Sequence, residues 1–240
     1  MFRVMIGFFL AVWIPSSLLG GIGIEHAEDY QKNSSLQREW AIDSLSRFDF
    51  YEEDHVLDVG CGDGKITAFI SSKVPKGLVV GLDISKQMIE KASSRFNENN
   101  LAFIQGDAID IPFKNQFDKV VSFLALHWVL DQTQALLSMR EALKEKGKML
   151  LVIPGQSENN LASLSEKLVR SEKWAKFFPV FNKQRVHFTI EEYKKLLSLV
   201  ELEIQSIKES ESLTVFKDKN NLMAWIKPLV NFIDHLDAEI

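Results

Sequence analysis

The chain has 240 residues and a formal net charge of -5, and 46% of its residues are hydrophobic. This content can fill the core of a folded domain, and the acidic balance gives no general attraction to the phosphates of a nucleic acid, so nucleic-acid substrates are not expected. The single cysteine, Cys61, excludes an internal disulfide bond and a zinc site built from several cysteines. The histidines show no ligand spacing, and we predict no metal site.

Residues 1–24 have the pattern of a targeting segment. Arg3 stands before an uncharged stretch from Val4 to Ile24, and the most apolar part of this stretch ends before Pro15. The pattern fits a cleaved secretory signal peptide, a membrane anchor that would contact a bilayer, or an apolar extension of the domain. We assign residues 1–24 as a signal peptide or membrane anchor outside the fold, and residues 25–240 as one domain.

Apolar runs and helical patterns alternate along this domain. Strands are predicted at residues 55–58, 77–83, 101–105, 117–123 and 147–154, with helices between them, and residues 202–215 add two strands that meet around Ser210. This alternation is typical of an α/β, Rossmann-like, doubly wound and mostly parallel sheet of seven strands, with helices on both faces. Residues 25–50 and 155–190 are expected to form cap elements, the second a helical substrate-cap insertion.

Three glycines follow the first predicted strand at alternate positions: Gly60, Gly62 and Gly64. Glycine allows close approach of the backbone to a ligand and readily takes a positive φ, so the loop predicts a nucleotide-like cofactor. Asp83 ends the next strand about twenty residues further on, where a carboxylate can accept hydrogen bonds from a ribose. NAD would also suit Asp83, but the glycine spacing departs from the dinucleotide fingerprint, and Asp63 places a negative charge where a pyrophosphate would lie.

An acidic loop is better matched to a cofactor without phosphate. S-adenosylmethionine has a ribose, an adenine and a cationic amino-acid end. Asp58 can face its ammonium group and the loop N–H groups its carboxylate, while Asp107 and Ala108 are placed for the adenine. Because ligands of open parallel sheets bind beyond the carboxyl ends of the strands, these residues are expected to meet at one site.

Four motifs in this order and spacing resemble those of the class I S-adenosylmethionine-dependent methyltransferases: Val56-Leu-Asp-Val-Gly-Cys-Gly-Asp-Gly64, Gly81-Leu-Asp-Ile-Ser85, Gly106-Asp-Ala108 and Phe117-Asp-Lys-Val120. Three further stretches resemble the juvenile hormone acid and trans-aconitate methyltransferase group, which methylates carboxylates: Tyr30-Gln-Lys-Asn-Ser-Ser-Leu-Gln37, Ser122-Phe-Leu-Ala-Leu-His-Trp-Val129 and Ser171-Glu-Lys-Trp174. The resemblance covers residues from about 30 to 236.

The resemblance implies roles for the matching residues. Those that would bind the cofactor are Asp58, Gly60, Cys61 and Gly62 at the methionine end, Asp83, Ile84, Asp107 and Ala108 at the ribose and adenine, and Leu124 beside the sulfonium. Those that would contact the substrate carboxylate are Gln37, His127 and Trp128. The residue types alone leave His127 and Trp128 equally suited to core packing, and Cys61 better suited to packing in the turn than to nucleophilic attack.

We therefore expect an S-adenosylmethionine-dependent methyltransferase that acts on a carboxylate oxygen of a small or medium organic acid. The alternatives are a malonyl-acyl carrier protein or other small-molecule O-methyltransferase, and, from another class, a non-catalytic cofactor-binding or assembly factor. A nicotinamide oxidoreductase is a third interpretation. Because the cofactor is made in the cytosol, we expect a cytoplasmic catalytic domain, although residues 1–24 leave export or membrane anchoring open.

Overall fold

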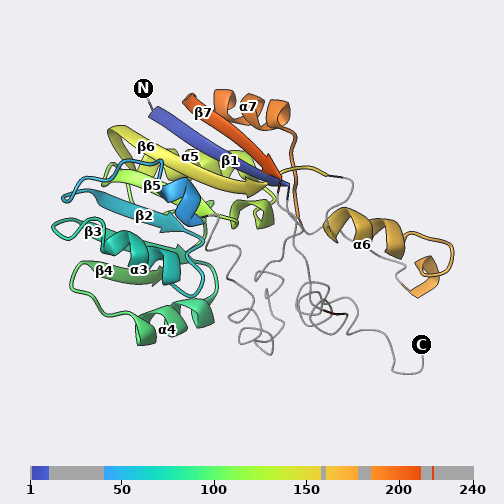
Figure 1. The fold of residues 1–240 in the computed structure, drawn as a ribbon, viewed down its shortest axis with the longest axis horizontal. Helices are drawn as coiled ribbons and strands as arrows, with labels where there is room; N and C mark the ends of the chain where they lie inside the picture. The colour runs from blue at the N-terminus through green and yellow to red at the C-terminus, as the bar shows by residue number, and fades with distance from the viewer. Residues whose placement is uncertain (1, 11–40, 158–160, 178–184, 212–217, 219–240) are drawn as a thin grey trace.

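A single sheet runs through the computed structural model, which describes residues 2–10, 41–157, 161–177, 185–211 and 218 (Figure 1). Its strands lie in the order β4-β3-β2-β5-β6-β1-β7, and all the recorded neighbours are parallel. These strands are β1 (Phe2–Leu10), β2 (His55–Val59), β3 (Leu78–Asp83), β4 (Leu101–Gln105), β5 (Phe117–Phe123), β6 (Leu143–Pro154) and β7 (Leu202–Glu211). The predicted doubly wound, mostly parallel sheet is confirmed.

Helices connect most of these strands. The described ones are α3 (Lys65–Ser71), α4 (Lys86–Arg95), α5 (Gln132–Ala142), α6 (Leu161–Val169) and α7 (Ile190–Leu199), with short 3-10 turns η2 (Leu126–Trp128) and η3 (Ala175–Phe177). Three helices begin at a residue whose side chain accepts a hydrogen bond from the first turn: Ser85 for α4, Asp131 for α5 and Thr189 for α7. Such caps satisfy N–H groups that have no partner inside the helix, and so they fix where the helices start.

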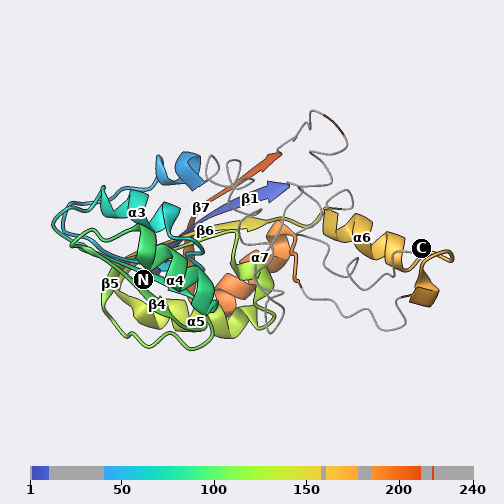
Figure 2. The same cartoon turned by 90° about the horizontal axis from the view of Figure 1, so that it is seen from below.

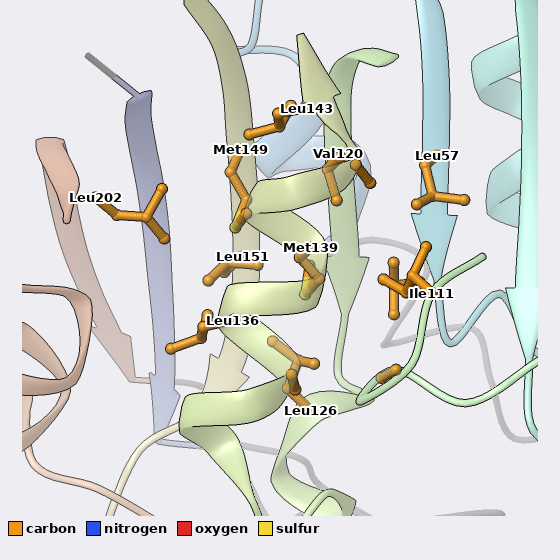
Figure 3. Packing of buried hydrophobic residues seen from close by; sticks show 14 of the residues in the cluster. Leu57, Ile111, Val120, Leu126, Leu136, Met139, Leu143, Met149, Leu151 and Leu202 are labelled. Atoms are coloured by element: carbon orange, nitrogen blue, oxygen red, sulfur yellow. The ribbon is translucent and has the colours of Figure 1, made fainter. Parts of the chain in front are cut away.

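The central strands send alternate residues into two separate cores, as the two-residue period of a strand requires. One core lies against α5 and α7, and Figure 3 shows part of it: Leu57, Val120 and Leu151 of the sheet with Leu136 and Met139 of α5. The other lies against α3 and contains the neighbouring positions: Val56, Val79, Val121 and Leu150 with Ile70. Helices therefore cover both faces of the sheet, with α3 and α5 on opposite sides (Figure 2).

The apolar N-terminal stretch contributes a strand inside the sheet. β1 pairs with β6 from Arg3 to Phe9 and with β7 along its whole length. The prediction that residues 1–24 lie outside the fold is therefore wrong for Phe2–Leu10. A run without charge indicates a signal or anchor, but it is equally typical of an interior strand of a parallel sheet, so periodicity could not separate the two. Residues 11–24 lie outside the described residues.

Two further expectations concern the C-terminal half. β7 continues through Ser210, so the predicted boundary between two strands at that residue is wrong, and residues 212–217 lie outside the described part. α6 lies beyond the carboxyl ends of the strands in both views (Figures 1 and 2), on the side of the sheet where a cap is expected. Its role as a cap stays a prediction. Among the described residues, no helix has the length and apolar character needed to span a bilayer.

Candidate active site

A cavity of about 540 Å³ lies at the carboxyl ends of β2, β3, β4 and β5. It is the kind of space that takes a small ligand, since such sites usually measure roughly 300 to 1,000 Å³. β3 and β5 flank β2 on opposite sides, so the cavity lies at the point where the strand order reverses direction. Its wall includes seven of the nine residues predicted to bind the cofactor: Gly60, Gly62, Asp83, Ile84, Asp107, Ala108 and Leu124.

The glycine loop needs glycine for two different physical reasons. Gly60, Gly62 and Gly64 all have positive φ angles of 77°, 55° and 78°, which side chains rarely adopt. At Gly60 there is also no room, because an added Cβ would lie 2.1 Å from the Cβ of Ala125. The loop therefore packs directly against the chain that leaves β5, and this close approach shapes one wall of the cavity.

Asp83 ties the glycine loop to the end of β3. Its Oδ2 accepts the backbone N–H of Gly62 at 2.9 Å, and its Oδ1 accepts the N–H of Ser85 at 2.9 Å. Burial raises the pKa of Asp83, while these two hydrogen bonds oppose the rise. Each carboxylate oxygen can accept more than one hydrogen bond, so Asp83 retains acceptor capacity towards the cavity that it lines.

Asp58 lies behind the loop instead of in the cavity wall. It is almost completely buried, and its Oδ2 accepts a hydrogen bond from the Thr67 hydroxyl at 2.7 Å. Burial raises the pKa of Asp58 to about 7; the Thr67 hydrogen bond lowers it and the charge of Asp83 raises it. The carboxyl group is therefore poised to change its charge near neutral pH, and a cation placed beside it would favour ionisation.

The far side of the cavity is less polar. Ile84 is 55% exposed there and provides an apolar surface for a flat ring. Asp107 Oδ1 accepts the backbone N–H of Ile109 at 3.1 Å, which orders the turn after β4, and Ala108 is buried beside it. Ile84, Asp107 and Ala108 therefore line the same cavity, and their contacts with a ribose or an adenine stay a prediction.

The chain after β5 makes the remaining wall. Leu124 has a φ angle of 51°, a strained conformation for a residue with a side chain, and its N–H donates to the carbonyl of Val152 at 2.7 Å. Trp128 also lines the cavity, whereas His127 is buried next to it, with 5.2 Å between the two ring centres. Strain beside a cavity is a common mark of a functional turn.

The environment of His127 favours the neutral imidazole. Burial lowers its pKa well below the ordinary value of 6.5, and the nearby charges of His187 and Arg185 lower it further. A neutral imidazole has one donor and one acceptor nitrogen. Of the three predicted substrate residues, the structure thus places His127 and Trp128 together, while Gln37 lies outside the described residues.

Two sequence arguments need correction. Cys61 is not part of the cavity wall; its sulfur packs against the backbone of Gly81, and burial raises the pKa of the thiol far above its usual range. The charge of Asp63 is compensated by Lys65, at 2.8 Å, and by Arg95, at 3.8 Å. Since these cations offset the charge, Asp63 is a weaker argument against a pyrophosphate than the sequence alone indicated.

Some cavity residues were not identified from sequence. They include Ser85, Ile109, Ala125, Val129 and Asp131. Ser85 and Asp131 cap α4 and α5, so a capping residue before a helical pattern was an available signal for both. The apolar residues of the cavity wall gave no sequence signal, because they differ from ordinary core residues only in their place in the fold.

Comparison with known families agrees with this geometry. A family model described as a methyltransferase domain matches residues 56–147. The matched segment contains β2 to β5 and the start of β6, and therefore all the strands that border the cavity.

Individual relatives extend the likeness beyond that segment. Juvenile hormone acid O-methyltransferase of Bombyx mori is 32% identical over 63% of this chain, which spans 57% of the silkworm protein. The protein of the same name from Drosophila melanogaster is 27% identical over 90% of this chain and 76% of its own. The crystal structure of the YcgJ protein from Bacillus subtilis has a TM-score of 0.62 at 24% identity, covering 84% of this chain and 86% of that one. This structural likeness concerns the fold alone.

Proposed function

Because the chain is an S-adenosylmethionine-dependent methyltransferase, we propose that it methylates a carboxylate oxygen of a small or medium organic acid. The observation that carries this proposal is the pairing of neutral His127 with Trp128 directly after β5, where Trp128 lines the cavity. An imidazole and an indole can both donate hydrogen bonds to a carboxylate oxygen. The carboxyl methyltransferases among the relatives support this choice of acceptor.

The residues of the cavity fit the cofactor. Gly60 and Gly62 place no side chains in the cavity that they line, and Asp83 has acceptor capacity for the two ribose hydroxyls. Ile84 and Asp107 provide an apolar surface and an acceptor on the adenine side. When bound, S-adenosylmethionine supplies a methyl group activated by a positively charged sulfur.

The protein then has little proton transfer to perform. A carboxylic acid ionises at a pKa of about 4, so the acceptor is already a nucleophile near neutral pH and needs no general base. His127 and Trp128 orient one oxygen of the acceptor carboxylate by hydrogen bonds. The apolar wall of the cavity excludes water. Orientation alone is a large effect, since well-aligned reacting groups behave as if present at roughly 10⁵ to 10⁸ M.

A panel of acceptors tests the proposal. The purified protein would be incubated with S-adenosylmethionine and fatty, isoprenoid, di- and tricarboxylic acids, malonyl-acyl carrier protein, amines and phenols, and S-adenosylhomocysteine would be measured. We expect turnover with at least one free acid. Transfer to amines or phenols alone would refute the carboxylate assignment, and turnover only with malonyl-acyl carrier protein would select that alternative.

Calorimetry separates the enzyme from a binding module. Titration with S-adenosylmethionine should give one site per chain. Binding without turnover across the whole panel would favour a non-catalytic role, and NADH binding in place of S-adenosylmethionine would revive the oxidoreductase interpretation.

A further inference from the structure

Arg185 stacks on the same tryptophan that lines the cavity. The guanidinium carbon of Arg185 lies 4.2 Å from the centre of the Trp128 ring, close enough for a cation–π interaction. Arg185 comes from the segment after α6 and η3, far along the chain from β5. The fold therefore brings a guanidinium group to the edge of the site where the substrate acid is expected.

The backbone around Arg185 is fixed at two points. The N–H of Val186 donates to the carbonyl of His127 at 2.9 Å. Two residues later, Phe188 forms a bridge with Gly155 after β6, and the N–H of Gln156 donates to the Phe188 carbonyl at 3.0 Å. The backbone next to Arg185 is thus held by η2 and by the residues that follow β6, which is the support a positioned recognition residue needs.

The surroundings of Arg185 favour an anion. Its side chain is half-buried, and burial lowers its pKa to about 9. His187 stands nearby, with its ring centre 6.0 Å from that of His127. A carboxylate brought into this group would meet a guanidinium, whose fork of N–H donors matches both carboxylate oxygens, together with two imidazoles and an indole.

We infer that Arg185 is a specificity-determining residue that binds the carboxylate of the acceptor and selects acids over uncharged acceptors. The inference rests on the proposed function, and it identifies the side chain that recognises the negative charge of the substrate. Arg185 would act beside His127 and Trp128, with the guanidinium supplying the charge and the two rings supplying orientation.

The chemistry gives this role a particular kinetic signature. In the reaction, a carboxylate oxygen forms a bond to the methyl carbon, the carbon–sulfur bond breaks with its electron pair leaving on sulfur, and both charges disappear. An ion pair with Arg185 is therefore strongest in the bound acid, weaker in the transition state and absent in the methyl ester. An interaction that favours the bound substrate in this way lowers KM without raising kcat, and it also helps the neutral product to leave.

The test compares Arg185→Met with Arg185→Lys. Methionine keeps an apolar chain over Trp128 but removes the charge, whereas lysine keeps the charge without the fork. For the best acid acceptor, we expect Arg185→Met to raise KM by roughly 10- to 100-fold, the value of a charge-assisted hydrogen bond, with kcat unchanged or higher. Arg185→Lys should recover part of the affinity.

Two measurements exclude a merely structural effect. S-adenosylmethionine affinity by calorimetry should stay within about twofold of the unmodified protein in both variants, since Arg185 is not part of the cavity wall. Arg140→Met serves as a matched control, because that guanidinium pairs with Glu201 at 2.7 Å and does not line the cavity. This control should leave KM unchanged.

Product inhibition gives the most specific readout. The unmodified enzyme should bind the acid much more tightly than its methyl ester, and Arg185→Met should bind the two about equally. An unchanged KM in Arg185→Met, or a fall in kcat at unchanged KM, would overturn the role of Arg185 while leaving acid methylation intact. Absence of any acid turnover in the unmodified protein would instead overturn the proposed function.

Discussion

The backbone N–H of Gly62 donates to the Asp83 carboxylate over 2.9 Å, and this hydrogen bond joins the glycine loop after β2 to the end of β3. The same carboxylate receives the N–H of Ser85 at the start of α4. Asp83 therefore arranges the loop and lines the cavity at once. A substitution at this position should disturb the shape of the loop together with the proposed contact to the ribose.

Asp83→Asn should weaken S-adenosylmethionine binding by more than roughly 100-fold. The amide keeps one acceptor oxygen but turns an NH₂ group towards either the Gly62 or the Ser85 N–H, so one partly buried donor loses its partner. Calorimetry measures the effect, and Asp110→Asn, on an exposed turn outside the cavity wall, is the control. Equal affinities for the two variants would contradict the role assigned to Asp83.

Gly60→Ala and Gly62→Ala form a matched pair. Both positions have positive φ angles, but a Cβ at Gly60 would collide with Ala125, whereas a Cβ at Gly62 meets nothing within 4 Å. We expect Gly60→Ala to lower the free energy of unfolding by about 2 to 5 kcal/mol, and Gly62→Ala by about 1 to 2 kcal/mol. Urea unfolding distinguishes them, and similar losses would show that the contact with Ala125 does not restrict the loop.

Asp58 predicts a pH dependence of stability. Its pKa is about 7 in the folded protein against an ordinary value of 3.8, so the unfolded chain loses its proton first as pH rises. The free energy of unfolding should therefore fall between about pH 4 and pH 7 and then level off.

Asp58→Asn isolates this contribution, because the variant lacks the titrating group but keeps an acceptor for Thr67. Unfolding free energies measured across the same pH range should fall less steeply in the variant. Saturating S-adenosylmethionine should also flatten the slope in the unmodified protein if its ammonium group binds near Asp58, as the family resemblance implies, because a nearby cation favours the ionised carboxylate. If the free energy of unfolding depends on pH equally in the variant and the unmodified protein, Asp58 is not the origin of that dependence.

β1 should be required for stability. Ile6 pairs with Leu151 of β6 and Ile207 of β7, so proline at this position removes a backbone donor inside the sheet. Ile6→Pro is expected to reduce the free energy of unfolding by on the order of 2 to 4 kcal/mol, and Ile6→Val to have a small effect. If Ile6→Pro unfolds at the same urea concentration as the unmodified protein, β1 makes no net contribution to the sheet.

The order of elements from β2 to β6 was predictable from sequence because β2, β3, β4 and β6 are apolar runs that end at, or directly before, an acid, a glycine or a proline. Asp83 and Asp107 were identifiable for the same reason, as acids at or within two residues of a strand end. β1 was not predictable from sequence, because an apolar run has the same composition whether it lies in a sheet or in a membrane. The packing of Arg185 on Trp128 was equally hidden, because it joins segments separated by β6 and α6.

The central claim is tested most directly by the chemical form of the transferred methyl group. S-adenosylmethionine carrying an isotopically labelled methyl group would be turned over with the best acid from the panel, and the product would be treated with mild base. A methyl ester releases the label as volatile methanol, and we predict that nearly all of the transferred label is recovered in that form. Label that remains in the product after base would show a methylated nitrogen, carbon or ether oxygen, and would contradict carboxylate methylation.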